Sequence, residues 1–226
     1  MLAIACAVLG GLVGAMVPAV TRRLLGVPAG PPEIGAECGA VRGAGGGTGL
    51  APPGWLWVPL GALVFGGLGW ALGPGPLLVA ALPVAAAGLA LVATDLACLR
   101  LPDPLIGGAF LGAAAVLGVT SIANGDGRPL LRCGLAGLGC AAAYCVGLAV
   151  PRAGLGMGDA KLSGLLGFLL GWLGWPAVLL GLALPYVCNA PVVLGLLLTR
   201  RVRRGTPLPF GPALLAGAYL TILLVR

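Results

Sequence analysis

Residues 77–94 read LLVAALPVAAAGLALVAT, a run without a single charged side chain. A helix rises about 1.5 Å per residue, so a run of this length crosses most of the roughly 30 Å hydrocarbon core of a bilayer. Similar apolar segments recur along the chain, at roughly 1–20, 55–73, 105–123, 133–150, 161–175, 177–198 and 209–225. The pattern predicts an all-α fold, a polytopic transmembrane helical bundle of about eight spans.

The composition agrees with a membrane protein. Hydrophobic residues make up 59% of the chain and charged residues 8%, with a mean hydropathy of +1.09. A soluble domain carries roughly 25% charged residues, so this chain has too few to cover a water-exposed surface. The composition therefore excludes a soluble enzyme, a nucleic-acid-binding domain and a disordered chain, and we expect membrane lipid around the protein and no nucleic acid partner.

The basic residues predict the orientation. If the first apolar segment starts outside, the positive-inside rule is satisfied, because the outer loops hold only Arg128, Arg132 and Arg226. The inner loops then hold Arg22, Arg23, Arg42, Arg100, Arg152, Lys161, Arg200, Arg201, Arg203 and Arg204. Eight spans place both termini outside.

Two aspartates stand at the borders of apolar segments. Asp95 ends the third segment and Asp159 begins the sixth. A carboxylate in the apolar region costs about 2.5–3.5 kcal/mol on insertion scales, so such residues are candidates for function. Two spans separate the pair, and an even number of crossings returns the chain to the same face. Two neighbouring carboxyls can act as general base and general acid, which suits a chain without histidine.

The sequence around Asp159 adds to this interpretation. Residues 156–162 read GMGDAKL, with two glycines before the carboxyl at the start of a predicted helix. Glycine allows a sharp bend and a close approach of another chain, and a helix N-terminus favours an ionised carboxylate.

These motifs resemble those of the type IV prepilin peptidases, which are membrane aspartyl proteases of the GxGD kind. Gly156-Met157-Gly158-Asp159-Ala160-Lys161-Leu162 matches the family's Gly-x-Gly-Asp-x-Lys signature. Asp95 followed by Leu101-Pro102-Asp103 matches its other catalytic segment, and Pro209-Phe210-Gly211-Pro212 matches a third element. The resemblance covers about 75–226 well and 1–74 only in outline.

The resemblance implies an all-helical bundle in the bacterial plasma membrane that cleaves the basic leader of prepilins or pseudopilins at the cytoplasmic face. It assigns catalysis to Asp95 and Asp159. The supporting residues of the active-site loops are Gly156, Met157, Gly158, Lys161, Pro102 and Asp103. For Asp103 we expect a turn-forming role, and for Arg100 and Lys161 a role as interfacial anchors.

One departure from the family concerns the loop after the first span. Many members carry two Cys-x-x-Cys pairs there that bind zinc, together with an N-methyltransferase activity. The loop 21–54 holds only Cys38, and one cysteine cannot supply a four-ligand zinc site. We therefore expect no metal, no cofactor and doubtful methyl transfer. The resemblance implies that residues 1–54 form the first helix plus this reduced loop and that 55–226 form the membrane aspartyl peptidase core.

Two rival hypotheses remain open. A presenilin-like intramembrane protease is suggested by Pro212-Ala213-Leu214, but Thr94 stands where that group has a tyrosine before the first aspartate. A transporter coupled to ions or protons is suggested by the paired carboxylates, since membrane carboxylates often serve ion relays. A cleavage assay separates the transporter from the peptidase.

Overall fold

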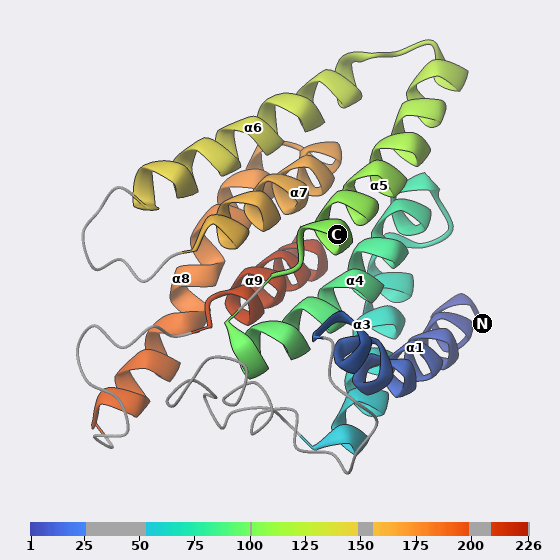
Figure 1. The fold of residues 1–226 in the computed structure, drawn as a ribbon. Coiled ribbons are helices and arrows are strands. Elements are labelled where there is room, and N and C mark those ends of the chain that lie inside the picture. The colour runs from blue at the N-terminus through green and yellow to red at the C-terminus, as the bar shows by residue number, and fades with distance from the viewer. Residues whose placement is uncertain (26–52, 100, 149–155, 199–208, 226) are drawn as a thin grey trace.

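The computed structural model describes residues 1–25, 53–99, 101–148, 156–198 and 209–225. Within these ranges, eight α-helices and one 3-10 turn are present and no strand is found, which confirms the all-α prediction (Figure 1). The elements are α1 (Leu2–Leu25), η1 (Gly54–Leu56), α3 (Trp57–Leu72), α4 (Pro76–Cys98), α5 (Asp103–Asn124), α6 (Arg128–Leu148), α7 (Met157–Leu173), α8 (Trp175–Leu198) and α9 (Gly211–Leu224).

The helices have the lengths of membrane spans. In the described part of the chain, six helical stretches are long and apolar enough to cross a membrane. They are α1, η1 with α3, α4, α5, α6 and α8, whereas α7 has 17 residues and α9 has 14. Several such helices make this an integral membrane protein. The expectation of about eight spans holds for the number of helices, although α7 and α9 are shorter than a full crossing.

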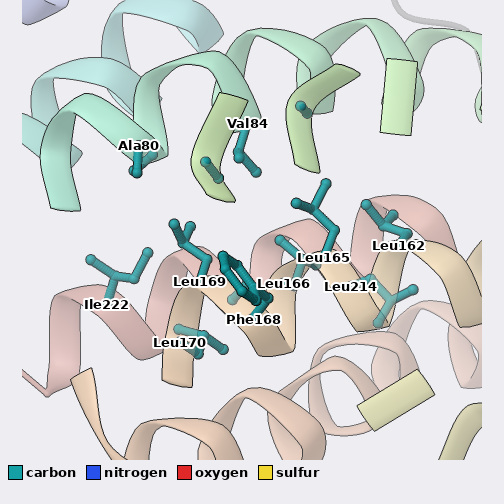
Figure 2. Packing of buried hydrophobic residues seen from close by; sticks show 14 of the residues in the cluster. Ala80, Val84, Leu162, Leu165, Leu166, Phe168, Leu169, Leu170, Leu214 and Ile222 are labelled. Atoms are coloured by element: carbon teal, nitrogen blue, oxygen red, sulfur yellow. The ribbon is translucent and has the colours of Figure 1, made fainter. Parts of the chain in front are cut away.

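Helices α4 and α7 form the centre of the bundle. In α4, 61% of the most apolar stretch is buried, compared with 17% to 28% in the other five spans. Helix α7 presents large buried side chains towards α4 and α9, as Figure 2 shows. Those labelled in Figure 2 are Leu162, Leu165, Leu166, Phe168, Leu169 and Leu170 from α7, with Ala80 and Val84 from α4 and Leu214 and Ile222 from α9. The two predicted catalytic aspartates thus lie on the two central helices.

Helices α6 and α7 pack closely because glycines face the contact. A Cβ at Gly167 would stand 2.7 Å from Sγ of Cys140, and one at Gly171 would stand 2.7 Å from Cα of Cys133. Small residues let membrane helices approach in this way. Since the later residue of α7 contacts the earlier residue of α6, the two helices are antiparallel.

Helix α6 begins earlier than the sequence predicted. The apolar segments 105–123 and 133–150 left 124–132 as an outer loop between them, but α6 already starts at Arg128. The carboxylate of Asp126 accepts the N–H of Arg128 at 2.9 Å, and Pro129 at the second helical position has a φ angle suited to a first turn. The side chain of Arg132 donates from Nε to the carbonyl of Gly171 at 2.6 Å and from its terminal nitrogen to that of Trp172 at 2.9 Å. An arginine expected in a loop therefore caps the end of α7.

Candidate active site

Asp159 lies in the first turn of α7 and is 5% exposed. Gly156 precedes the helix with extended backbone angles, and its N–H donates to Oδ2 of Asp159 at 2.8 Å. The backbone N–H of Asp159 donates in turn to the carbonyl of Gly156 at 3.0 Å. The other carboxylate oxygen, Oδ1, is buried and has no hydrogen-bond partner among the described residues. One oxygen of the carboxyl is thus held by the backbone, and the other has no partner among the described residues.

Asp95 lies in the last turn of α4 and is 3% exposed. Its Oδ2 accepts a hydrogen bond of 3.0 Å from the backbone N–H of Gly211, the first residue of α9. A Cβ at Gly211 would stand 2.8 Å from the same oxygen, so only glycine allows the backbone this close. The third sequence element, quoted above only for its resemblance, therefore supplies a donor to the first aspartate.

The end of α4 has a strained backbone that the sequence did not predict. Leu99 closes the helix with φ of 52°, the left-handed region that glycine normally occupies. Its N–H donates to the carbonyl of Asp95 at 2.9 Å. Such strain persists where the surroundings enforce it and often marks functional segments. Here it turns the chain at the end of the helical turn that carries the candidate carboxyl, Asp95.

The structure brings Asp95 and Asp159 to the same end of the bundle. Helices α4 and α7 are in contact, and the two carboxyl groups interact electrostatically. Figure 1 shows the end of α4 and the beginnings of α7 and α9 on one side of the molecule. A Cβ at Gly158 would stand 2.9 Å from Cβ of Leu101, so the chain leaving α4 packs on the Gly-x-Gly-Asp turn. The second glycine of that motif is needed for this approach.

The remaining predicted residues are placed around this pair. Nζ of Lys161 forms an ion pair of 2.6 Å with Oδ2 of Asp103, and both side chains are substantially exposed. Asp103 is the first residue of α5 and Pro102 precedes it as the N-cap. Met157 is exposed. Lys161, for which we expected an interfacial anchor, and Asp103, for which we expected a turn, thus join α7 to α5.

Other predictions lie outside the described residues. Arg100 and most of the loop 21–54, including Cys38, are among them. In the part of the chain that the structure describes, no group of three or more histidine, cysteine or acidic side chains is arranged to hold a metal. Cys98 at the end of α4 is disulfide-bonded. The groups that the structure places at the site are two buried carboxyls with backbone donors.

The comparisons with known proteins point to one class. Over 76 residues, the chain is 37% identical to a prepilin leader peptidase/N-methyltransferase of Aeromonas hydrophila, covering 34% of this chain and 25% of that protein. It is 40% identical over the same length to one of Pseudomonas putida, with the same shares covered. The matched part spans about a quarter of the length of these curated relatives. No family model and no solved structure matches the chain.

Proposed function

We propose that the chain is a membrane endopeptidase of the aspartic type that removes the basic leader peptide from type IV prepilins or pseudopilins. The observation that carries the proposal is the pairing of two buried carboxyls, Asp95 and Asp159, at adjoining ends of the two central helices. A buried carboxylate is costly in a membrane protein and is a functional-site candidate by default.

The proposed reaction uses both carboxyls. One is ionised and takes a proton from a water molecule, whose oxygen adds to the carbonyl carbon of the scissile peptide. The other is protonated and donates its proton to the leaving nitrogen as the C–N bond breaks. Two carboxyls whose charges interact divide the roles of acid and base in this way. Activity then requires one proton retained and one lost, so the rate passes through a maximum as pH is varied.

The identity of the substrate rests on the relatives. The two relatives compared above are both prepilin leader peptidases with N-methyltransferase activity in their names. By the positive-inside rule we expect the aspartate end at the cytoplasmic face, where a short basic leader also stays, and the relatives' names favour a bacterial plasma membrane. The proposal does not extend to methyl transfer, because the loop 21–54 holds Cys38 as its single cysteine and no histidine.

The test is cleavage of a co-expressed prepilin with a basic leader, read as a shift on a gel and by mass spectrometry of the new N-terminus. Asp95→Asn and Asp159→Asn preserve the size of the side chain and remove its acid–base function. Each change alone should abolish cleavage, and the double variant should lose little more activity than either single variant, because the two residues act as one unit. Asp103→Asn is the matched control, since it removes a carboxyl at the same end of the bundle, and it should retain substantial activity.

Expression of every variant is measured alongside cleavage. Near-normal cleavage by the Asp95 or the Asp159 variant at normal expression would contradict the dyad and favour the rival hypothesis of an ion-coupled transporter. Cleavage on the outer side of the membrane would contradict the proposed orientation.

A further inference from the structure

Tyr144 carries a buried hydroxyl group whose presence needs an explanation. It lies in α6, is 1% exposed, and its oxygen has no hydrogen-bond partner among the described residues. Leaving a buried polar group unpaired costs about 1–3 kcal/mol. A phenylalanine would fill the same space without that cost, so the hydroxyl points to a function.

The packing of α6 on α7 places Tyr144 and Asp159 at the same level of the two helices. Oγ of Ser163 donates to the carbonyl of Cys140 at 3.4 Å, which fixes one level of the antiparallel pair. One helical turn further along α6 is Tyr144, and one turn back along α7 is Asp159. The two side chains interact electrostatically. The unpaired hydroxyl of Tyr144 and the unpaired Oδ1 of Asp159 therefore lie at the same level of two packed helices.

Two aromatic rings from other elements hold Tyr144 in this position. Its ring stacks on that of Tyr186 from α8, with centroids 5.9 Å apart and an interplanar angle of 17°. The centroid of the Phe210 ring lies 6.1 Å from that of Tyr144. Phe210 directly precedes Gly211 in the sequence, and the N–H of Gly211 donates to Asp95. Tyr186 also carries a hydroxyl, but among the described residues the two side chains do not meet the geometry of a hydrogen bond. The Tyr144 ring therefore contacts the segment that supplies the donor to Asp95.

We propose that Tyr144 is a further catalytic residue, whose hydroxyl donates a hydrogen bond to the carbonyl oxygen of the scissile peptide. The inference rests on the peptidase function proposed above. A peptide and a water bound between the two unpaired atoms satisfy both, because the carbonyl oxygen accepts from Tyr144 and the water donates to Asp159. The hydroxyl keeps its own proton throughout the reaction.

The hydrogen bond strengthens during the reaction. When the water oxygen adds to the carbonyl carbon, the π electrons of the C=O bond move to the oxygen and make it negative. A preorganised donor stabilises that charge more than it stabilises the neutral carbonyl. Loss of the donor therefore lowers kcat more than it changes KM.

The test is Tyr144→Phe, which keeps the ring packed and removes only the hydroxyl. We expect kcat for prepilin cleavage to fall on the order of 100-fold, as for loss of one oxyanion donor. KM should change little, and the melting temperature should stay the same or rise, because the lost hydroxyl had no partner. The control is Tyr219→Phe in α9, whose hydroxyl donates to the carbonyl of Leu63 at 3.0 Å. That variant should melt earlier and cleave normally.

Each outcome decides between a catalytic and a structural role. Normal kcat in Tyr144→Phe would overturn the inference and leave the hydroxyl to a structural water in the cavity of about 10 Å³ that Tyr144 and Cys140 line. A raised KM at unchanged kcat, or a lower melting temperature in step with the lost activity, would also overturn it. If the unchanged protein cleaves no prepilin, the proposed function is wrong, and the inference about Tyr144 is then wrong as well.

Discussion

The backbone N–H of Gly211 donates a hydrogen bond of 3.0 Å to Oδ2 of Asp95, although 116 positions separate the two residues. The contact joins the last turn of α4 to the first residue of α9. It also explains why a glycine stands at 211, since a Cβ there would lie 2.8 Å from the carboxylate oxygen. The geometry of one candidate catalytic carboxyl therefore depends on a helix near the other end of the chain.

Gly211→Ala should lower prepilin cleavage while the protein stays folded. The added methyl group would displace the Asp95 carboxylate or lengthen its hydrogen bond, and small displacements of a catalytic group cost on the order of 100-fold in rate. Cleavage assays and thermal unfolding in detergent would measure the two effects. Gly118→Ala in α5 is the matched control, because a Cβ there meets no atom within 4 Å. Equal activity of the two variants would show that the Gly211 contact is dispensable.

The two glycines of the Gly-x-Gly-Asp motif should respond differently to alanine. A Cβ at Gly158 would stand 2.9 Å from Cβ of Leu101, whereas at Gly156 the nearest atom, Oδ2 of Asp159, would lie at 3.5 Å. Gly158→Ala should therefore reduce cleavage more strongly than Gly156→Ala, which also keeps the N–H that binds Asp159. The measurement is the initial cleavage rate at matched expression. A larger loss at Gly156 would contradict the packing of Leu101 on this turn.

The ion pair between Lys161 and Asp103 should contribute little stability. Its side chains are 49% and 66% exposed, and solvent-exposed pairs contribute about 0–1 kcal/mol. Asp103→Asn and Lys161→Gln should each shift the unfolding free energy by less than about 1 kcal/mol. The pair still joins α5 to α7, so Asp103→Lys should reduce cleavage by repulsion. Combining Asp103→Lys with Lys161→Asp should restore cleavage, and failure of this rescue would show that the pair does not position the site.

Arg132 should stabilise the protein at the opposite end of α7. Its guanidinium donates to the carbonyls of Gly171 and Trp172, and hydrogen bonds that involve a charged group contribute about 1.5–3 kcal/mol. Arg132→Ala should therefore lower the melting temperature in detergent by several degrees, and Arg132→Lys should recover only part of the loss, because lysine lacks the planar fork. Arg128→Ala, an exposed arginine in the same turn, is the control. An unchanged melting temperature in Arg132→Ala would refute the capping role.

The sequence by itself determined the membrane class, the all-α architecture and the positions of most helices. In lipid, the backbone N–H and C=O groups of a charge-free apolar run such as 77–94 must form hydrogen bonds within the protein. The α-helix is the structure that forms all of these bonds within one segment of the chain. The sequence also predicted that Asp95 and Asp159 lie at the same membrane face, because two spans separate them. Counting spans requires no knowledge of how the helices pack. The apolar pattern did not give the start of α6, which begins at Arg128 because the side chain of Asp126 accepts a hydrogen bond from the N–H of Arg128.

Only the tertiary structure decided what surrounds the two carboxyls. The donor at Gly211, the unpaired hydroxyl of Tyr144 and the pair of Lys161 with Asp103 come from helices far apart in the chain. Apolar periodicity does not specify which helices become neighbours in lipid, because the bilayer solvates every apolar face about equally well. Glycine-mediated close packing selects the partners, and that selection fixes which atoms meet Asp95 and Asp159.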